Sequence, residues 1–194
     1  MPNSISFNPF PNLIHKFNYD FDTDTLVNKV RESHHSAPES LSMLEQGDAY
    51  SSVGQLQPHT WPETKDFQEW LKPVIDQVWD EYHFRKIKKW IGGSWYNVHL
   101  REGETLEHPH AHVDIVASCY VKAPVGTGNI LFRDPLEYHR TNTPITPERE
   151  IWHEVPVTTG DVLLFPGWLK HKTQPNATDE ERIVFTFNII SHEV

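Results

Sequence analysis

Three histidines and an aspartate occupy alternate positions in residues 108–114, which run His-Pro-His-Ala-His-Val-Asp. In an extended chain, side chains two positions apart point to the same side, so all four could share one face. Two of them, with a third ligand from elsewhere, could hold one metal ion. Imidazole and carboxylate groups favour iron(II), zinc, copper or nickel over calcium or magnesium. The alternative is a solvated, histidine-rich loop at the end of a strand.

A second segment carries a distant histidine and an arginine. Residues 160–171 run Gly-Asp-Val-Leu-Leu-Phe-Pro-Gly-Trp-Leu-Lys-His, which predicts a turn, a buried strand and a bend before His171. Arg182 then opens the apolar strand Arg-Ile-Val-Phe-Thr-Phe-Asn. Burying an arginine is costly unless it meets an anion, and its planar guanidinium suits a carboxylate. This segment favours a metal site over a solvated loop.

Other motif-like segments of the sequence lack an essential part. Gly126-Thr-Gly128 has neither the third glycine nor the following helix of a dinucleotide-binding loop. His153-Glu154 begins like a zinc-protease helix, but Val157 stands where the second histidine is needed. The single cysteine, Cys119, lies in an apolar run, so we expect a buried, unreactive thiol.

Composition and charge limit the class of protein. The 194 residues suit a single domain (1–194), and the 37% of hydrophobic residues can form a core. The net charge of -10 argues against nucleic-acid and anionic-membrane binders. We find no secretory signal and no apolar run of the about 18 residues that span a membrane. The expected location is therefore the cytoplasm.

Residues 1–85 are predicted to be rich in helices and loops. A short helix is expected over 24–31, followed by an exposed loop over 34–57. A longer helix is expected to begin at Thr60 with a capping box, and Pro73 should kink it. Its apolar side chains follow helical spacing: Phe67, Trp70, Leu71, Val74, Ile75, Val78, Trp79 and Tyr82.

Residues 86–194 are predicted to form a strand-rich core. No helical pattern separates the candidate strands, so we expect an antiparallel barrel or a two-sheet jelly roll, with the helices on one outer face. The fold class is α+β. The candidate strands cover residues 87–91, 95–101, 114–122, 129–132, 150–155, 161–165 and 182–191.

Together these residues resemble a family of 2-oxoglutarate/iron(II) oxygenases found in bacteria and their phages. The resemblance covers about residues 95–188, through His108-Pro-His110, the segment 128–135 (Gly-Asn-Ile-Leu-Phe-Arg-Asp-Pro), and the motifs around His171 and Arg182. It implies a double-stranded β-helix, a cupin-like jelly roll, with iron at its open end. It also implies a dioxygenase that consumes 2-oxoglutarate and O2, releases succinate and CO2, and hydroxylates a further substrate.

Two sets of metal ligands remain open. The wider superfamily uses a His-x-Asp pair, which His112-Val-Asp114 matches literally, whereas ungapped alignment with the nearer family selects His108 and His110. Asp114 runs directly into an apolar strand, which leaves little chain for a loop. We therefore favour His108, His110 and His171 over His112, Asp114 and His171. An all-histidine set departs from the usual facial triad.

The resemblance also implies a co-substrate site. Arg182 would bind the distal carboxylate of 2-oxoglutarate, and it joins the three histidines in the expected catalytic set. Asn97, Tyr120 and Asn188 are further candidates for contact with the co-substrate. Structural hydrogen bonds are an equal alternative for the two asparagines.

Two other functions are compatible with the sequence. The first is a cupin-like enzyme that holds its metal through three histidines and does not use 2-oxoglutarate. The second is a non-catalytic β-sandwich that binds a ligand or forms part of an assembly. Residues 34–57 and 132–148 are candidate lids over the site, whatever its chemistry.

Overall fold

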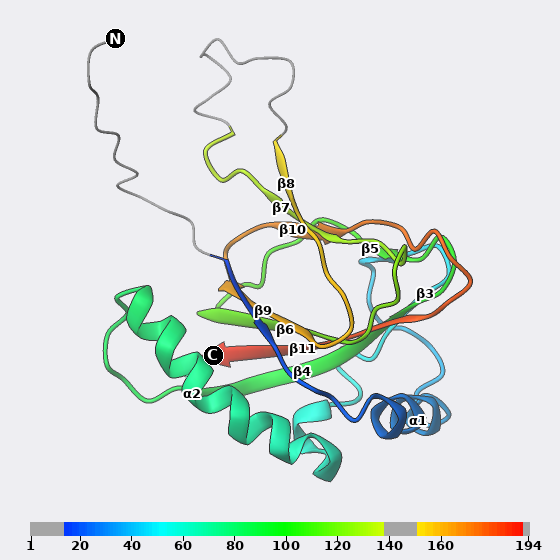
Figure 1. Cartoon of the computed structure of the whole chain (residues 1–194), viewed down its shortest axis with the longest axis horizontal. Coiled ribbons are helices and arrows are strands. Elements are labelled where there is room, and N and C mark those ends of the chain that lie inside the picture. Colours follow the sequence, from blue (N-terminus) through cyan, green and yellow to red (C-terminus); the bar gives the residue numbers. More distant parts are fainter. Residues whose placement is uncertain (1–13, 138–150, 192–194) are drawn as a thin grey trace.

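The computed structural model describes residues 14–137 and 151–191 (Figure 1). The helices in these ranges are α1 (Thr23–His34) and α2 (Lys65–Glu81), with short 3-10 helices η1 (Pro58–Thr60) and η2 (Pro62–Thr64) before α2. The strands are β1 (His15–Asn18), β2 (Glu45–Gln46), β3 (Ala49–Ser51), β4 (Trp90–His99), β5 (Glu104–Thr105), β6 (Ile115–Lys122), β7 (Ile130–Arg133), β8 (Trp152–Val155), β9 (Asp161–Pro166), β10 (His171–Thr173) and β11 (Arg182–Ile190).

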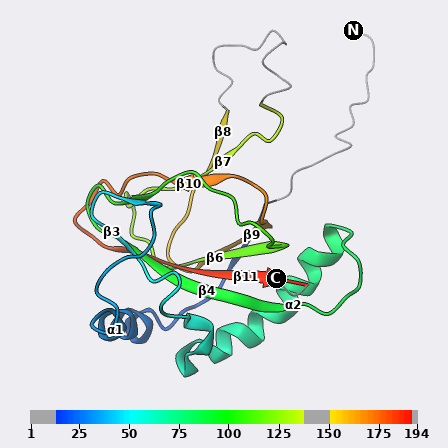
Figure 2. The same ribbon diagram turned by 180° about the vertical axis from the view of Figure 1, so that it is seen from behind.

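The strands form a large sheet, a smaller sheet and a short ribbon. Six strands pair antiparallel in the order β1-β9-β6-β11-β4-β3, three in the order β10-β7-β8, and β2 pairs with β5. Figures 1 and 2 show the smaller sheet over one face of the large sheet and the two helices against the other face. The predicted α+β arrangement, with helices on one outer face, is therefore observed.

Alternation along the strands of the large sheet sends side chains into two different layers. On β11, Phe185 and Phe187 pack in the cluster shared with the helices, whereas Val184 packs in the cluster between the sheets. Because both faces are covered, these strands are nearly continuous apolar runs rather than alternating ones. Cys119 faces the helices and is fully buried, and burial raises the pKa of its thiol well above the ordinary value. The expected inert thiol is thus consistent with its surroundings.

The two helices bury the apolar stripes that the sequence predicts. Helix α1 begins after Asp22, whose carboxylate accepts a hydrogen bond from the backbone N–H of Thr25 at 3.1 Å. Helix α2 continues through Pro73. The buried side chains are Leu26, Val27 and Val30 on α1 and Phe67, Leu71, Ile75, Val78 and Trp79 on α2. Within the described ranges, no helix is both long and apolar enough to cross a membrane.

Helix α2 begins later than predicted, and the capping box at Thr60 does not form. Pro58 and Pro62 each start a 3-10 turn instead, because proline has the φ of a first helical position and needs no N–H partner there. Thr64 is the residue before α2, and its hydroxyl donates to the carbonyl of Pro58 at 2.7 Å. Two 3-10 turns therefore occupy the residues where the first turn of the helix was predicted.

The strands predicted over 87–91 and 95–101 are a single strand, β4. Gly92 lies at an irregularity in the pairing of β4 with β11. A Cβ atom at Gly92 would lie 2.4 Å from Cδ1 of Ile190, so a larger residue there would displace that side chain. The sequence predicted a break between residues 91 and 95, but Gly92 and Gly93 lie within one long strand.

Residues 34–57 are not the exposed loop that their composition suggests. Strand β3 forms an edge of the large sheet beside β4, and β2 pairs with β5. Tyr50 on β3 is buried, and its hydroxyl donates to the carbonyl of Ala37 at 2.6 Å. The strands are too short for an apolar period to be visible in the sequence. In the other candidate lid, 132–148, residues 138–148 lie outside the described residues.

We expect Phe187→Ala to lower the free energy of unfolding by about 3–5 kcal/mol, because the alanine leaves a cavity between α2 and the large sheet. Phe187 is fully buried, with its ring centroid 5.4 Å from that of Phe67. Urea unfolding would measure the loss. Val125→Ala is the control, since Val125 is 92% exposed. A similar loss in both variants would contradict this account of the core.

Candidate metal and co-substrate site

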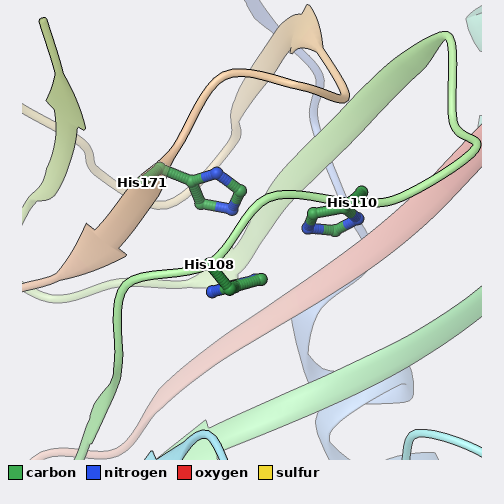
Figure 3. Close-up of side chains that lie close together, drawn as sticks. All are labelled: His108, His110 and His171. Carbon is green, nitrogen blue, oxygen red and sulfur yellow. The ribbon is translucent and has the colours of Figure 1, made fainter. Parts of the chain in front are cut away.

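The three histidines lie on two extended segments that are joined through their backbones. The N–H of His108 donates to the carbonyl of His171 at 3.0 Å, and the N–H of His171 returns a bond to His108 at 3.1 Å. Residues directly opposite in such a pair point to the same side, as does His110, two positions after His108. The N–H of His110 donates to the carbonyl of Gly167 at 2.8 Å. This pairing turns the three imidazoles toward one another (Figure 3).

Backbone carbonyls determine the tautomer of two of these rings. Nδ1 of His108 lies 2.7 Å from the carbonyl oxygen of Leu106, and Nδ1 of His171 lies 2.9 Å from that of Leu169. A carbonyl oxygen can only accept, so each Nδ1 carries the proton. Nε2 of each ring therefore has a lone pair for a metal ion.

A side-chain amide orients the third ring. Nδ1 of His110 lies 2.8 Å from Oδ1 of Asn188, which gives His110 the same tautomer. The indole of Trp95 stacks on the His110 ring, with centroids 5.5 Å apart. The candidate ligand atoms of the three histidines all lie within 4.8 Å of one another. This donor set suits a first-row transition metal.

Burial keeps the three imidazoles neutral. It lowers the pKa of His108, and it lowers the pKa of His171 well below its ordinary value, with His108 as the next cause. Burial and the neighbouring His108 bring the pKa of His110 down to about 4. At neutral pH, protons therefore do not compete with a metal for these nitrogens.

The alternative pair of ligands lies apart from this cluster. His112 is exposed, and its φ of 61° places it in the left-handed region. Asp114 immediately precedes β6, and its N–H donates to the carbonyl of Ile189 at 3.0 Å. Neither residue belongs to the group of close ligand atoms.

A small cavity with polar and apolar side chains in its wall extends from the histidines into the space between the two sheets. It encloses about 30 Å³, and Asn97 and Tyr120 are in its wall. Oδ1 of Asn97 is buried and has no hydrogen-bond partner within residues 14–137 and 151–191. Burial raises the pKa of Tyr120 to about 12, so its hydroxyl stays protonated. The cavity thus offers polar groups to a ligand, but side chains in its wall must rotate to admit one larger than water.

Arg182 lies behind this wall rather than in it. The side chain is fully buried at the start of β11, and its register partner on β4, His99, lines the cavity. Nη1 of Arg182 donates to the carbonyl of Thr127, Nη2 to that of Gln174 at 3.1 Å, and Nε to Nδ1 of His99 at 3.2 Å. In the described part of the chain, no carboxylate lies within 4.0 Å of this guanidinium. A buried cation without a direct anion suits an anionic ligand.

Gly128 makes room for this arginine. Its φ of 89° is in the left-handed region, and a Cβ atom there would lie 2.8 Å from both Nη1 of Arg182 and the carbonyl oxygen of Gln174. A larger residue would therefore displace the guanidinium or the backbone that it bonds.

A wider groove opens beside the histidines. It has a volume of about 290 Å³. Part of its lining is shared with the cavity, and residues between 42 and 53 extend the lining. The shared residues are Trp95, Asn97, Thr105, His108 and His110, and the additional residues include Ser42, Leu44, Glu45, Ser51 and Val53.

Sequence reasoning left some residues of the site without a role. Asn188, a candidate for contact with the co-substrate, contacts Nδ1 of His110 through its Oδ1. Trp95 and Glu45 were not considered, and His99 was left without a role. The parity of β4 could have identified Trp95 and His99, because both share a face with Asn97. No comparable signal existed for Glu45, which lies on a two-residue strand.

One protein family matches the chain. Residues 93–188 match the model of a family described as "Putative 2OG-Fe(II) oxygenase". No curated protein sequence matches the chain.

Several solved structures share the fold. A prolyl-4-hydroxylase from Pseudomonas putida aligns over 94% of both chains, with a TM-score of 0.64 and 9% identity. HygX from Streptomyces hygroscopicus, with nickel, 2-oxoglutarate and hygromycin B bound, covers 92% of this chain and 82% of its own, with a TM-score of 0.61 and 12% identity. A viral collagen prolyl hydroxylase from Paramecium bursaria Chlorella virus-1, in complex with 2-oxoglutarate, covers 91% and 94%, with a TM-score of 0.58 and 14% identity. The predicted double-stranded β-helix is confirmed.

We expect Gly128→Ala to destabilise the protein more than Gly54→Ala, by about 1–3 kcal/mol of unfolding free energy. Both glycines have a positive φ, but an added Cβ meets nothing within 4 Å at Gly54, whereas at Gly128 it meets Arg182 and two carbonyls. Comparison of the two variants by urea unfolding isolates the crowding from the backbone strain. Equal losses would mean that the approach of Gly128 to Arg182 is unimportant.

Proposed function

Because the chain belongs, through residues 93–188, to the 2OG-Fe(II) oxygenases and is thus an oxidoreductase, we propose that it hydroxylates a C–H bond of a primary substrate and releases succinate and CO2. His108, His110 and His171 are the proposed iron ligands, and Arg182 is the proposed partner of the distal carboxylate of 2-oxoglutarate. The observation that carries this proposal is the cluster of three neutral imidazoles whose candidate ligand atoms lie within 4.8 Å of one another, together with a buried guanidinium that has no carboxylate partner among the described residues. The non-catalytic β-sandwich that the sequence also allowed is not compatible with an oxidoreductase.

The iron site is supported by how the chain prepares its donors. Each ring already presents an unprotonated Nε2, because oxygens of Leu106, Leu169 and Asn188 accept hydrogen bonds from the Nδ1–H groups. Such outer partners fix the orientation of metal-bound imidazoles and raise their basicity. Bound iron and 2-oxoglutarate would supply the oxidation of an unactivated C–H bond by O2.

The proposed co-substrate site is supported by polar groups whose hydrogen-bond donors or acceptors are not all used by the protein. The described residues take three of the five N–H donors of Arg182. Asn97 and Tyr120 lie in the cavity wall on the strands that flank β11. Arg182 would neutralise the distal carboxylate, while the amide and the phenol would orient the molecule toward the histidines.

The primary substrate would enter through the groove. Its wall includes Leu44 and Val53 as well as Ser42 and Ser51, so it offers both apolar contact and hydroxyl groups. His108 and His110 belong to this wall as well as to the cavity. A substrate in the groove would therefore lie beside the metal.

One observation favours a second candidate function. No carboxylate belongs to the close cluster in the described ranges, so the proposed ligands are three histidines instead of two histidines and a carboxylate. A cupin-like enzyme that oxidises its substrate without 2-oxoglutarate could use the same ligands. The two candidates differ in their need for Arg182.

We expect His108→Asn to weaken Fe(II) binding by more than about a hundredfold, since it removes one of three ligands. The matched control is His112→Asn, because His112 is exposed and asparagine tolerates its left-handed φ. Anaerobic Fe(II) titration measures both affinities. The alternative set of His112, Asp114 and His171 predicts the opposite result.

We further expect 2-oxoglutarate, added without oxygen to the Fe(II)-loaded protein, to produce a weak visible charge-transfer band. Arg182→Leu should abolish the band at moderate 2-oxoglutarate concentrations and leave Fe(II) affinity unchanged, because the arginine binds only the co-substrate. Succinate formation in air provides a second readout. Wild-type protein that binds Fe(II) but gives neither band nor succinate would favour the second candidate.

A further inference from the structure

A chain of hydrogen bonds runs from Arg182 through His99 to Glu45. Nε of Arg182 donates to Nδ1 of His99 at 3.2 Å. A guanidinium has no acceptor, so Nδ1 must carry the lone pair and Nε2 must carry the proton. Nε2 lies 3.1 Å from Oε2 of Glu45 and 2.9 Å from Oγ1 of Thr105, and the Thr105 hydroxyl itself donates to Glu45 at 2.9 Å. His99 is therefore a neutral imidazole with one fixed tautomer.

The three side chains in this series of hydrogen bonds are buried. Arg182 and His99 are 0% exposed, and the side chain of Glu45 is 4% exposed. Burial is the main cause that lowers the pKa of His99, and the charge of Arg182 adds to it. A buried carboxylate and a buried guanidinium are thus linked through a neutral ring, and the fully buried Arg182 has no access to water as a replacement partner.

The position of each member suggests what the chain does. His99 lines the cavity, Arg182 lies behind the cavity wall, and Glu45 lines the adjoining groove. The carbonyls of Thr127 and Gln174 hold the two Nη atoms, so the bond from Nε to His99 is the remaining contact that fixes the plane of the guanidinium. That plane decides where the unused N–H donors of Arg182 point.

We propose that His99 is a positioning residue for the binding of 2-oxoglutarate. Its Nδ1 orients Arg182 for a carboxylate, and Glu45 with Thr105 holds the ring in the tautomer that permits this. The inference rests on the proposed role of Arg182. It adds a residue that touches neither the metal ligands nor, by itself, the co-substrate carboxylate.

Two amide substitutions test the hydrogen bonds of the two ring nitrogens of His99 one at a time. In His99→Asn, the amide oxygen takes the place of Nδ1 and can still accept from Arg182, but the contact with Glu45 is lost. In His99→Gln, the amide nitrogen takes the place of Nε2 and can still donate to Glu45, but the acceptor for Arg182 is lost. Both variants keep a neutral polar side chain of moderate size.

The experiment is an anaerobic titration of Fe(II)-loaded full-length protein with 2-oxoglutarate, followed by the charge-transfer band, with Fe(II) affinity measured separately. We expect His99→Gln to raise the Kd for 2-oxoglutarate about tenfold or more and His99→Asn to raise it by less than about threefold. Both should keep wild-type Fe(II) affinity. Equal changes in the two variants, or no change in either, would overturn the proposal.

A third variant covers the case in which His99→Gln does not fold. Glu45→Gln keeps an acceptor for Nε2 of His99 and removes only the charge, so the Kd for 2-oxoglutarate should stay within about threefold of wild type. A tenfold change would mean that the charge of Glu45, and not the bond at His99, controls affinity, which also overturns the proposal. If the wild-type protein itself does not bind 2-oxoglutarate, the proposed function fails and His99 is not the reason.

Discussion

The reciprocal backbone hydrogen bonds between His108 and His171 are the constraint on which the rest of the site depends. They join the segment before β6 to the start of β10, two parts of the chain that are far apart in sequence. Once this pair is formed, the period of an extended chain turns His110 to the same side. The two sheets then enclose the cavity behind the three rings, and the helices cover the far side of the large sheet without entering the site.

The buried arginine makes a second demand on the fold. A guanidinium between two sheets is stable only if its donors find acceptors, and carbonyls of Thr127 and Gln174 provide two of them. Their loops can approach because Gly128 has no side chain. A glycine that looks like an ordinary turn residue in the sequence is thus part of the setting of Arg182, in a protein whose family uses a dicarboxylate co-substrate.

The sequence predicted well whatever depends on local pattern. The i, i+2 spacing over residues 108–114 indicated a set of histidines on one face, the resemblance to a family singled out His108 and His110 within it, and the strand count indicated the fold. It failed where distant contacts decide. Gly92 interrupts the apolar pattern of β4, but the pairing of β4 with β11 continues on both sides of it with a shift in register. Glu45 is brought to the site by the pairing of β2 with β5. Short strands of this kind leave no periodic signal.

The bond between the backbones of His108 and His171 also bears on how the protein acquires its metal. Peptide groups set the spacing of these two ligands, so an arriving ion meets donors that are already assembled and deprotonated. Such a site would bind an ion without refolding, in contrast to small zinc domains whose folding energy comes from the metal. Three imidazoles bind copper and nickel more tightly than iron(II). By affinity alone, this donor set would therefore not select iron(II) over those two ions.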